Sequence, residues 1–103
     1  MLDLFLTLET RAVPRYSHRT FAGVRFVFKF DADDETILHI FARHLKTPED
    51  AIAAWVAGQA VWSDECDRFE SRHEAAGVGV TWFWISEPDV VMVISCYNLR
   101  EEI

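Results

Sequence analysis

The segment TPEDAIAAWVAG, residues 47–58, carries the clearest helix signature in the chain. Its threonine can cap a helix, its proline suits the first helical position, and two acidic residues in the first turn interact favourably with the helix dipole. An apolar stripe follows, and the closing glycine suits the position just after a helix. The stripe consists of Ile52, Trp55 and Val56. We therefore expect a helix from about Pro48 to Ala57, with β-structure on either side of the helical region.

A shorter helix is expected just before this one. Residues 31–35 form an acidic break in which Asp33 or Asp34 can cap a helix. The apolar residues that follow recur at helical spacing. They are Ile37, Ile40, Phe41 and Leu45, with His44 among them. Together the two helices are expected to occupy residues 34–58.

Residues 2–30 are expected to form a β-hairpin. Leucine at every second position from 2 to 8 is typical of a strand with one apolar face. Apolar residues alternate again from Val24 to Phe30. Pro14 ends the first strand, because proline lacks the N–H donor that a strand ladder needs. Residues 15–20 are then expected to form a loop.

Residues 60–98 are expected to form an antiparallel meander, because only short turns separate the strand patterns. The polar segment 67–74 suits an edge strand, whereas the nearly all-apolar segment 90–97 suits a central strand. The other strands are expected at 60–64 and 80–85. We thus predict a single α+β domain over residues 1–103. It would be a curved antiparallel sheet, made of the N-terminal hairpin and the C-terminal meander, with two short helices packed on one face.

The chain has a formal net charge of −7, which disfavours generic nucleic-acid binding. Residues 10–30 are different, since they hold five Lys or Arg residues and no acidic residue. This segment would form either a basic surface or the solvated side of the hairpin. No apolar run reaches the roughly 20 residues that span a membrane, and the first residues lack the basic start of a signal peptide. A cytoplasmic protein without membrane contact is expected.

His39 and Arg43 are the leading candidates for chemistry. Four residues apart on a helix, they share one face. An imidazole can transfer protons and a guanidinium can bind a phosphate, and RNA cleavage without a cofactor uses both. The plainer interpretation is a surface histidine beside an arginine that pairs with an acidic residue such as Asp50 or Glu35. His44 fits the apolar stripe of its helix better than a pair of metal ligands.

Further candidate groups lie in the expected sheet. Arg68 and Arg72 share one side of their strand by period two, and so do Ser95 and Tyr97. The two arginines either bind phosphate opposite the helix or protect an exposed edge. If their face meets the helices, Ser95 and Tyr97 lie near His39; alternatively, Tyr97 fills the edge of the core and bonds through its hydroxyl. No motif predicts a metal site or a cofactor, and Cys66 and Cys96 lack the spacing of a zinc site.

From about residue 36 to 98 the chain resembles the small RelE-like and BrnT-like toxins, and the related domains that open with His-x-x-x-Arg. The resemblance rests on HIFAR at 39–43, TPEDAIAAWVAG, VWSDECDRFES and the late strand VVMVISCY. It implies a ribonuclease that cleaves RNA by acid–base chemistry without a metal or a cofactor. The catalytic residues that it implies are His39, Arg43, Arg68, Arg72, Ser95 and Tyr97.

Two interpretations of the function therefore stay open. The first is a small toxin-like ribonuclease whose partner is RNA. The second is an acidic, non-enzymatic binding protein that covers a basic protein partner. Immunity proteins, antitoxin-like inhibitors and phage-encoded inhibitors of a nuclease or defence protein belong to this second class. A homodimer joined through strand edges is a third hypothesis.

Overall fold

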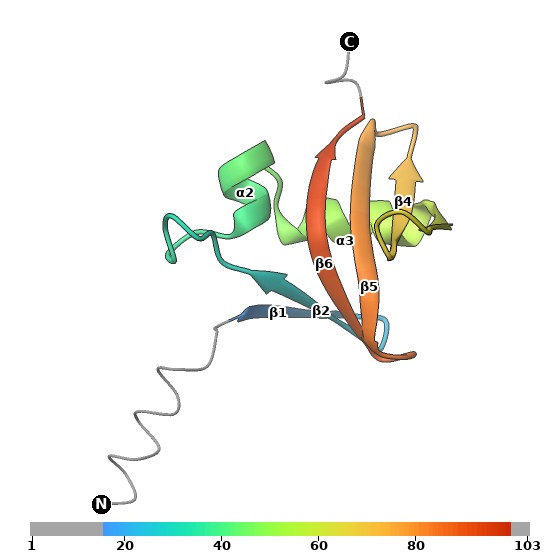
Figure 1. Cartoon of the computed structure of the whole chain (residues 1–103), viewed down its shortest axis with the longest axis horizontal. Helices are drawn as coiled ribbons and strands as arrows, with labels where there is room; N and C mark the ends of the chain where they lie inside the picture. The colour runs from blue at the N-terminus through green and yellow to red at the C-terminus, as the bar shows by residue number, and fades with distance from the viewer. Residues whose placement is uncertain (1–15, 100–103) are drawn as a thin grey trace, which may run out of the picture.

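The computed structural model describes residues 16–99, and the strand expected near residues 2–9 lies outside them. The described chain forms one six-stranded sheet and two helices, which confirms the expected mixture of helix and sheet (Figure 1). The strands are β1 (Tyr16–Phe21), β2 (Val24–Lys29), β3 (Gln59–Ser63), β4 (Arg68–His73), β5 (Val78–Ser86) and β6 (Val90–Asn98). The helices are α2 (His39–His44) and α3 (Pro48–Ala57).

The strands lie in the order β1-β2-β6-β5-β4-β3. Every neighbouring pair is antiparallel except β2 and β6, which run parallel with Phe26 opposite Val91. The expectation of a purely antiparallel sheet is therefore wrong at this pair. The reason is topological. The last strand inserts between β2 and β5, so the helices and the three strands before it act as the long crossover that a parallel pair needs.

The hairpin is shorter and later than expected. Residues 16–20 were predicted as loop, yet they form most of β1 and pair with β2 from Tyr16 opposite Lys29 to Phe21 opposite Val24. Ala22 and Gly23 close it with positive φ values of 53° and 84°, as a two-residue hairpin turn of type I′ requires. β1 shows little apolar alternation because nearly all of its residues are exposed at the edge of the sheet.

α2 begins later than the acidic break predicted. Its N-terminal cap is the extended residue Leu38, which makes no side-chain capping bond. The aspartates fold the preceding loop instead. The Asp34 carboxylate accepts hydrogen bonds from the N–H and the hydroxyl of Thr36. Leu45 then ends α2 in the left-handed conformation. The predicted cap at Asp33 or Asp34 is therefore wrong, because the Asp34 carboxylate bonds to Thr36 and the Asp33 carboxylate lies against Arg43 of α2.

α3 has the bounds that the sequence predicted. The Thr47 hydroxyl accepts a hydrogen bond from the N–H of Asp50, and the Asp50 carboxylate accepts one from the N–H of Thr47. This reciprocal capping box satisfies backbone donors that the first turn of a helix leaves free. Gly58 follows the helix. A Cβ added at this position would lie 2.7 Å from the Ala54 carbonyl oxygen and 2.8 Å from the backbone nitrogen of Arg72. Glycine is therefore required by the close approach of α3 to β4.

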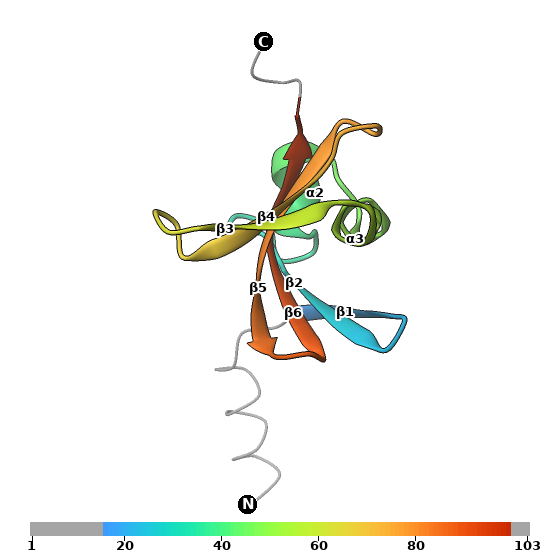
Figure 2. The ribbon, with the colours of Figure 1, turned by 90° about the vertical axis from the view of Figure 1, so that its right-hand side faces the viewer.

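β6 is a central strand, as predicted, but β4 is not an edge strand, since β3 pairs with its outer side. β4 is polar because alternate residues lie on the sheet face that α3 leaves uncovered. α3 packs against β4, β5 and β6 on the other face, while α2 lies beside β6 and β2 (Figures 1 and 2). The pairing of β2 with β6 ends at Phe28 and Val93, and beyond this point α2 contacts β6 through His44 and Tyr97.

The core lies between α3 and the sheet face that α3 covers. Its largest fully buried hydrophobic side chains are Phe26, Phe28, Val80, Val91, Val93 and Cys96. Trp55 of α3 packs edge-on against Phe26 and Trp82, with ring centroids 5.1 and 5.4 Å apart. The buried Trp82 also donates a 2.9 Å hydrogen bond to the Ser71 hydroxyl. Trp82 and Trp84 thus pack in or against the core, whereas Trp62 is 47% exposed.

Candidate functional site

The first candidate site is the Asp31 cluster, which we define as Asp31, His39 and Arg43. The Asp31 side chain is almost fully buried just after β2, and both partners come from α2. Nδ1 of His39 lies 3.2 Å from Oδ1 of Asp31, and Nε of Arg43 lies 3.4 Å from the same oxygen. His39 and Arg43 share one helix face, as predicted, and both therefore reach the same carboxylate.

The loop between β2 and α2 holds Asp31 in place. A β-bridge between Phe30 and Leu38 closes the loop, and the N–H of Asp31 donates to the Ile37 carbonyl at 2.9 Å. The other carboxylate oxygen of Asp31 accepts a 3.0 Å bond from the N–H of Asp33. These bonds hold the carboxylate without the help of α2 side chains. His39 is therefore oriented by a carboxylate that has its own bonding partners in the loop.

Asp31 is ionised at neutral pH despite its burial. Burial by itself raises the pKa of this carboxyl group, but the bond from the Asp33 N–H and the contacts with His39 and Arg43 outweigh it. The pKa of Asp31 therefore lies below its ordinary value. With an ionised acceptor on Nδ1, the neutral imidazole of His39 carries its proton on Nδ1. Nε2 then bears the lone pair, as a general base requires.

Arg43 is only partly available to a phosphate. Its guanidinium contacts Asp31 and also lies 3.4 Å from Oδ2 of Asp33, and its side chain is half exposed. The plainer interpretation of Arg43 as a salt-bridge residue is thus confirmed, although the partners are Asp31 and Asp33. Asp50, one of the acids considered from the sequence, closes the capping box of α3 instead. A phosphate must therefore compete with carboxylates for Arg43.

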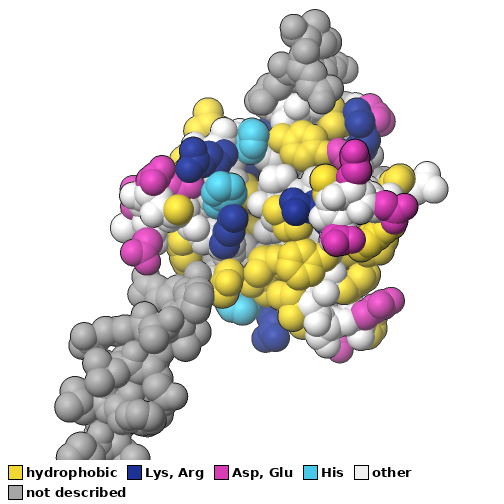
Figure 3. All heavy atoms as spheres, in the orientation of Figure 1, with side chains coloured by type: hydrophobic (Ala, Val, Ile, Leu, Met, Phe, Trp, Pro, Cys, Tyr) yellow, Lys and Arg dark blue, Asp and Glu magenta, His cyan; other side chains and the backbone are white. Residues whose placement is uncertain are grey.

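The other predicted residues lie on what we call the open face, the sheet surface opposite α3. Strand register places Arg72, Gly79 and Tyr97 in one cross-strand row and Glu70, Thr81 and Ser95 in the next. Arg68 precedes Glu70 by two residues and so lies on the same face. Figure 3 shows this side of the molecule, with histidine and basic side chains beside a hydrophobic middle and acidic side chains toward the flanks.

Polar side chains of the open face bond to one another. The Tyr97 hydroxyl donates to the Glu70 carboxylate across β5. The hydroxyls of Thr81 and Ser95 lie 2.6 Å apart. Gly79 makes room for this arrangement, because the Tyr97 ring lies over it. The ring of Tyr97 therefore packs on the sheet, and its hydroxyl bonds to Glu70.

The two arginines of β4 bind nearby acceptors. Nε of Arg72 lies 3.2 Å from the Glu74 carboxylate, and Nε of Arg68 donates to the Cys66 carbonyl at 3.0 Å. Arg68 also lines a small pocket of about 160 Å³ on the open face. Its lining residues are Ser63, Cys66, Arg68, Glu70 and Thr81. Each arginine thus has a bonding partner beside the open face.

His44 links α2 to the open face. Its ring meets the Tyr97 ring edge-on, with the centroids 6.4 Å apart. The sequence assigned His44 to packing, and this contact is a packing contact with a residue of the predicted site. The Asp31 cluster and Tyr97 are therefore joined through α2. Asp31 and Glu70, which bond directly to predicted residues, were not proposed from the sequence.

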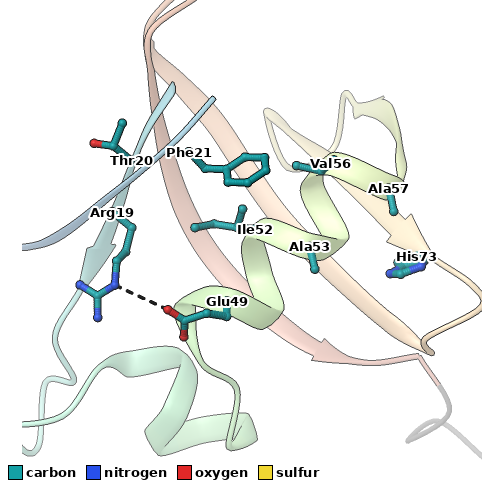
Figure 4. Close-up of a pocket in the computed structure, with 9 residues that line it drawn as sticks. All are labelled: Arg19, Thr20, Phe21, Glu49, Ile52, Ala53, Val56, Ala57 and His73. Carbon is teal, nitrogen blue, oxygen red and sulfur yellow. Dashed lines mark ion pairs between the residues drawn. The ribbon is translucent and has the colours of Figure 1, made fainter. Parts of the chain in front are cut away.

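A second candidate feature is the apolar groove between α3 and β1 (Figure 4). It has a volume of about 560 Å³. Its lining residues are Arg19, Thr20, Phe21, Glu49, Ile52, Ala53, Val56, Ala57 and His73. Phe21 and Val56 are each about half exposed, and the Arg19–Glu49 ion pair, at 3.8 Å, lies toward the start of α3. The groove is thus a large apolar surface with charge at its rim.

Within residues 16–99, no three His, Cys, Asp or Glu side chains gather as metal ligands. The same residues contain no helix long and apolar enough to cross a membrane. Both cysteines are free, Cys66 exposed and Cys96 buried. Burial raises the pKa of the Cys96 thiol to about 12, and the charge of Asp50 adds to this effect.

The chain was compared with models of protein families, with curated proteins and with solved structures, and none of the three comparisons gave a match.

Proposed function

We propose that this protein is a small metal-independent ribonuclease in which His39 is the general base. The observation that carries the proposal is the Asp31–His39 pair. A buried, ionised carboxylate holds Nδ1 of a histidine whose side chain is 25% exposed. This arrangement directs the basic Nε2 away from Asp31. A carboxylate that orients a histidine in this way favours proton transfer by the ring.

The proposed reaction is an intramolecular transesterification of RNA. Nε2 of His39 removes the proton from a ribose 2′-hydroxyl, whose oxygen attacks the adjacent phosphorus. The bond from phosphorus to the 5′-oxygen breaks, and that oxygen receives a proton from water or from a protonated side chain. The products are a 2′,3′-cyclic phosphate and a 5′-hydroxyl. Arg43 lies on the same helix face and would stabilise the charge on the phosphate oxygens.

The open face would hold the RNA strand. Arg68 and Arg72 supply positive charge at fixed positions on β4, and Ser95 and Tyr97 supply hydroxyl groups on β6. The contact between His44 and Tyr97 places α2 beside this surface. Because the chain carries a net charge of −7, RNA binding would depend on these few cations and would weaken steeply with added salt.

The test is cleavage of a defined RNA oligonucleotide by the purified chain in EDTA, with the ends of the products analysed. We expect a 2′,3′-cyclic phosphate, and an oligonucleotide with a 2′-deoxy linkage at the cut site should resist. His39→Ala should lower the rate by roughly 10²–10⁴-fold, as is typical for a lost general base. His18→Ala is the matched control, because His18 lies exposed on β1 outside the proposed site, and it should keep most of the activity.

Asp31→Asn tests the orienting role of the carboxylate. The amide can still reach Nδ1 but carries no charge, so cleavage should fall while the fold is retained. Intact RNA with the wild-type chain would refute the proposal. Equal cleavage by wild type and His39→Ala would do so as well.

The apolar groove favours a second candidate function, an acidic non-enzymatic protein that covers a basic protein partner. Apolar side chains of such a partner would enter the groove beside Phe21 and Val56, and its basic residues would face the acidic surface of this chain. Phe21→Asp would then abolish binding of a basic nuclease in calorimetry, whereas His39→Ala would leave it unchanged. Loss of binding on His39→Ala but not on Phe21→Asp would contradict this candidate.

A further inference from the structure

β3 is an outermost strand of the sheet. β4 pairs with one side of it, and no segment within residues 16–99 pairs with the other. Four of its five residues are exposed, among them Val61 at 61% and Trp62 at 47%. An open edge presents backbone N–H and C=O groups that can pair with another strand. β3 therefore has a surface suited to strand addition.

The two edges of the sheet differ in their protection. β1, the opposite edge, carries His18 and Arg19, and Arg19 forms an ion pair with Glu49 of α3. β3 reads QAVWS and contains no charged residue, no proline and no glycine. Charge and proline are the features that normally keep an edge strand from pairing with another chain. Of the two edges, β3 is the one that lacks them.

We propose that β3 is a self-association surface, at which β3 strands from two copies of this chain pair antiparallel about a twofold axis at Val61. Val61 of one copy then faces Val61 of the other, and Ala60 faces Trp62. This register pairs all five residues of each strand. The two sheets would continue into one another, and the proposal does not depend on the enzymatic or binding function proposed above.

The charges next to β3 select the antiparallel orientation. The turn after β3 holds Asp64, Glu65 and Asp67. Arg72 lies opposite Gln59 at the other end of β3, and its half-exposed side chain pairs with Glu74, so this end carries no such excess of negative charge. Antiparallel pairing places the acidic turn of one copy near Arg72 of the other. Parallel pairing would place two acidic turns together, at a cost in an already acidic protein.

Only a short strand and its flanks meet in this contact, so we expect a reversible, concentration-dependent dimer.

The pairing predicts a specific cross-link. Directly opposite residues of an antiparallel pair have Cα atoms about 4.5–5.5 Å apart, which suits a disulfide. In a Cys66→Ser background, Val61→Cys should give a disulfide-linked dimer under mild oxidation. Ala60→Cys is the matched control and should cross-link far less, because the two Ala60 positions lie two residues apart in this register.

Sedimentation over a range of concentrations tests the equilibrium itself. Val61→Lys places two ammonium groups opposite one another and should weaken dimerisation by about tenfold or more. Thr20→Lys makes the same kind of change on the β1 edge and should leave dimerisation unaltered. A chain that stays monomeric at every concentration would overturn the proposal. So would a dimer that Thr20→Lys dissociates and Val61→Lys does not, or equal cross-linking at positions 60 and 61.

Discussion

Replacement of Gly79 by alanine tests how the open face is built. A Cβ at this position would lie 2.8 Å from Cε2 and Cζ of Tyr97 and 2.9 Å from Cδ2 of Leu99. Carbon atoms in favourable contact lie about 3.5–4.0 Å apart, so the Tyr97 ring must move by roughly 0.7 Å or more. The ring is tethered, because its hydroxyl donates to the Glu70 carboxylate. The Leu99 methyl group can rotate away more easily.

The expected cost follows from these contacts. Overpacking of a well-filled site costs about 1–3 kcal/mol, and a displaced ring also weakens its bond to Glu70. We expect Gly79→Ala to lower the free energy of unfolding by about 2 kcal/mol. For a domain of this size, that corresponds to a fall in Tm of roughly 8–16 °C.

A double-mutant cycle measured by urea denaturation isolates the contact. The cycle contains wild type, Gly79→Ala, Tyr97→Ala and the double variant. In the Tyr97→Ala background the ring is gone, so Gly79→Ala should change the free energy of unfolding by less than about 0.5 kcal/mol. An equal cost in both backgrounds, or no cost in the wild-type background, would refute the placement of the Tyr97 ring over Gly79.

Three further predictions concern the helix cap, the thiols and the buried carboxylate. Thr47→Ala removes the capping hydroxyl of α3 and should cost about 1 kcal/mol in chemical denaturation. At neutral pH, Ellman's reagent should titrate one thiol in the folded chain, Cys66, and two after unfolding, because Cys96 is buried with a pKa of about 12. Asp31→Asn should lower stability at neutral pH, and its deficit relative to wild type should shrink in acid.

Proton linkage determines how the stability deficit of Asp31→Asn changes with pH. Asp31 has a lower pKa in the folded chain than its ordinary 3.8, so its ionised form stabilises the fold above that value. The stabilisation is lost as the pH falls through the lower, folded pKa. A deficit for Asp31→Asn that grows in acid would contradict this.

Thr47→Ser serves as the control for the cap, since it keeps the hydroxyl. Cys66→Ser should abolish the reaction of the folded chain with Ellman's reagent.

Local interactions explain what the sequence predicted well. The ends of α3 are set by Thr47, Pro48 and Gly58, whose effects act within one turn of the helix. β6 was predicted to be central because its nearly unbroken apolar sequence can only be buried between other strands. The sharing of one face by His39 and Arg43 follows from helical spacing alone. Each of these predictions depends on residues within a few positions of one another.

Contacts distant in sequence decided the rest. β1 has no apolar alternation, so only its pairing with β2 identifies it as a strand. The parallel pairing of β2 with β6 depends on where the last strand inserts, which no local pattern encodes. Asp31 reaches His39 across a loop, and Glu70 reaches Tyr97 across a whole strand.

The sequence by itself therefore determined the capped helix, the central strand and the placing of His39 and Arg43 on one helix face. The tertiary structure decided which groups surround that pair. It placed a buried carboxylate against both side chains, because folding of the loop after β2 brings Asp31 under α2. It also decided which edge strand is left unprotected, because that depends on the order of strands in the sheet.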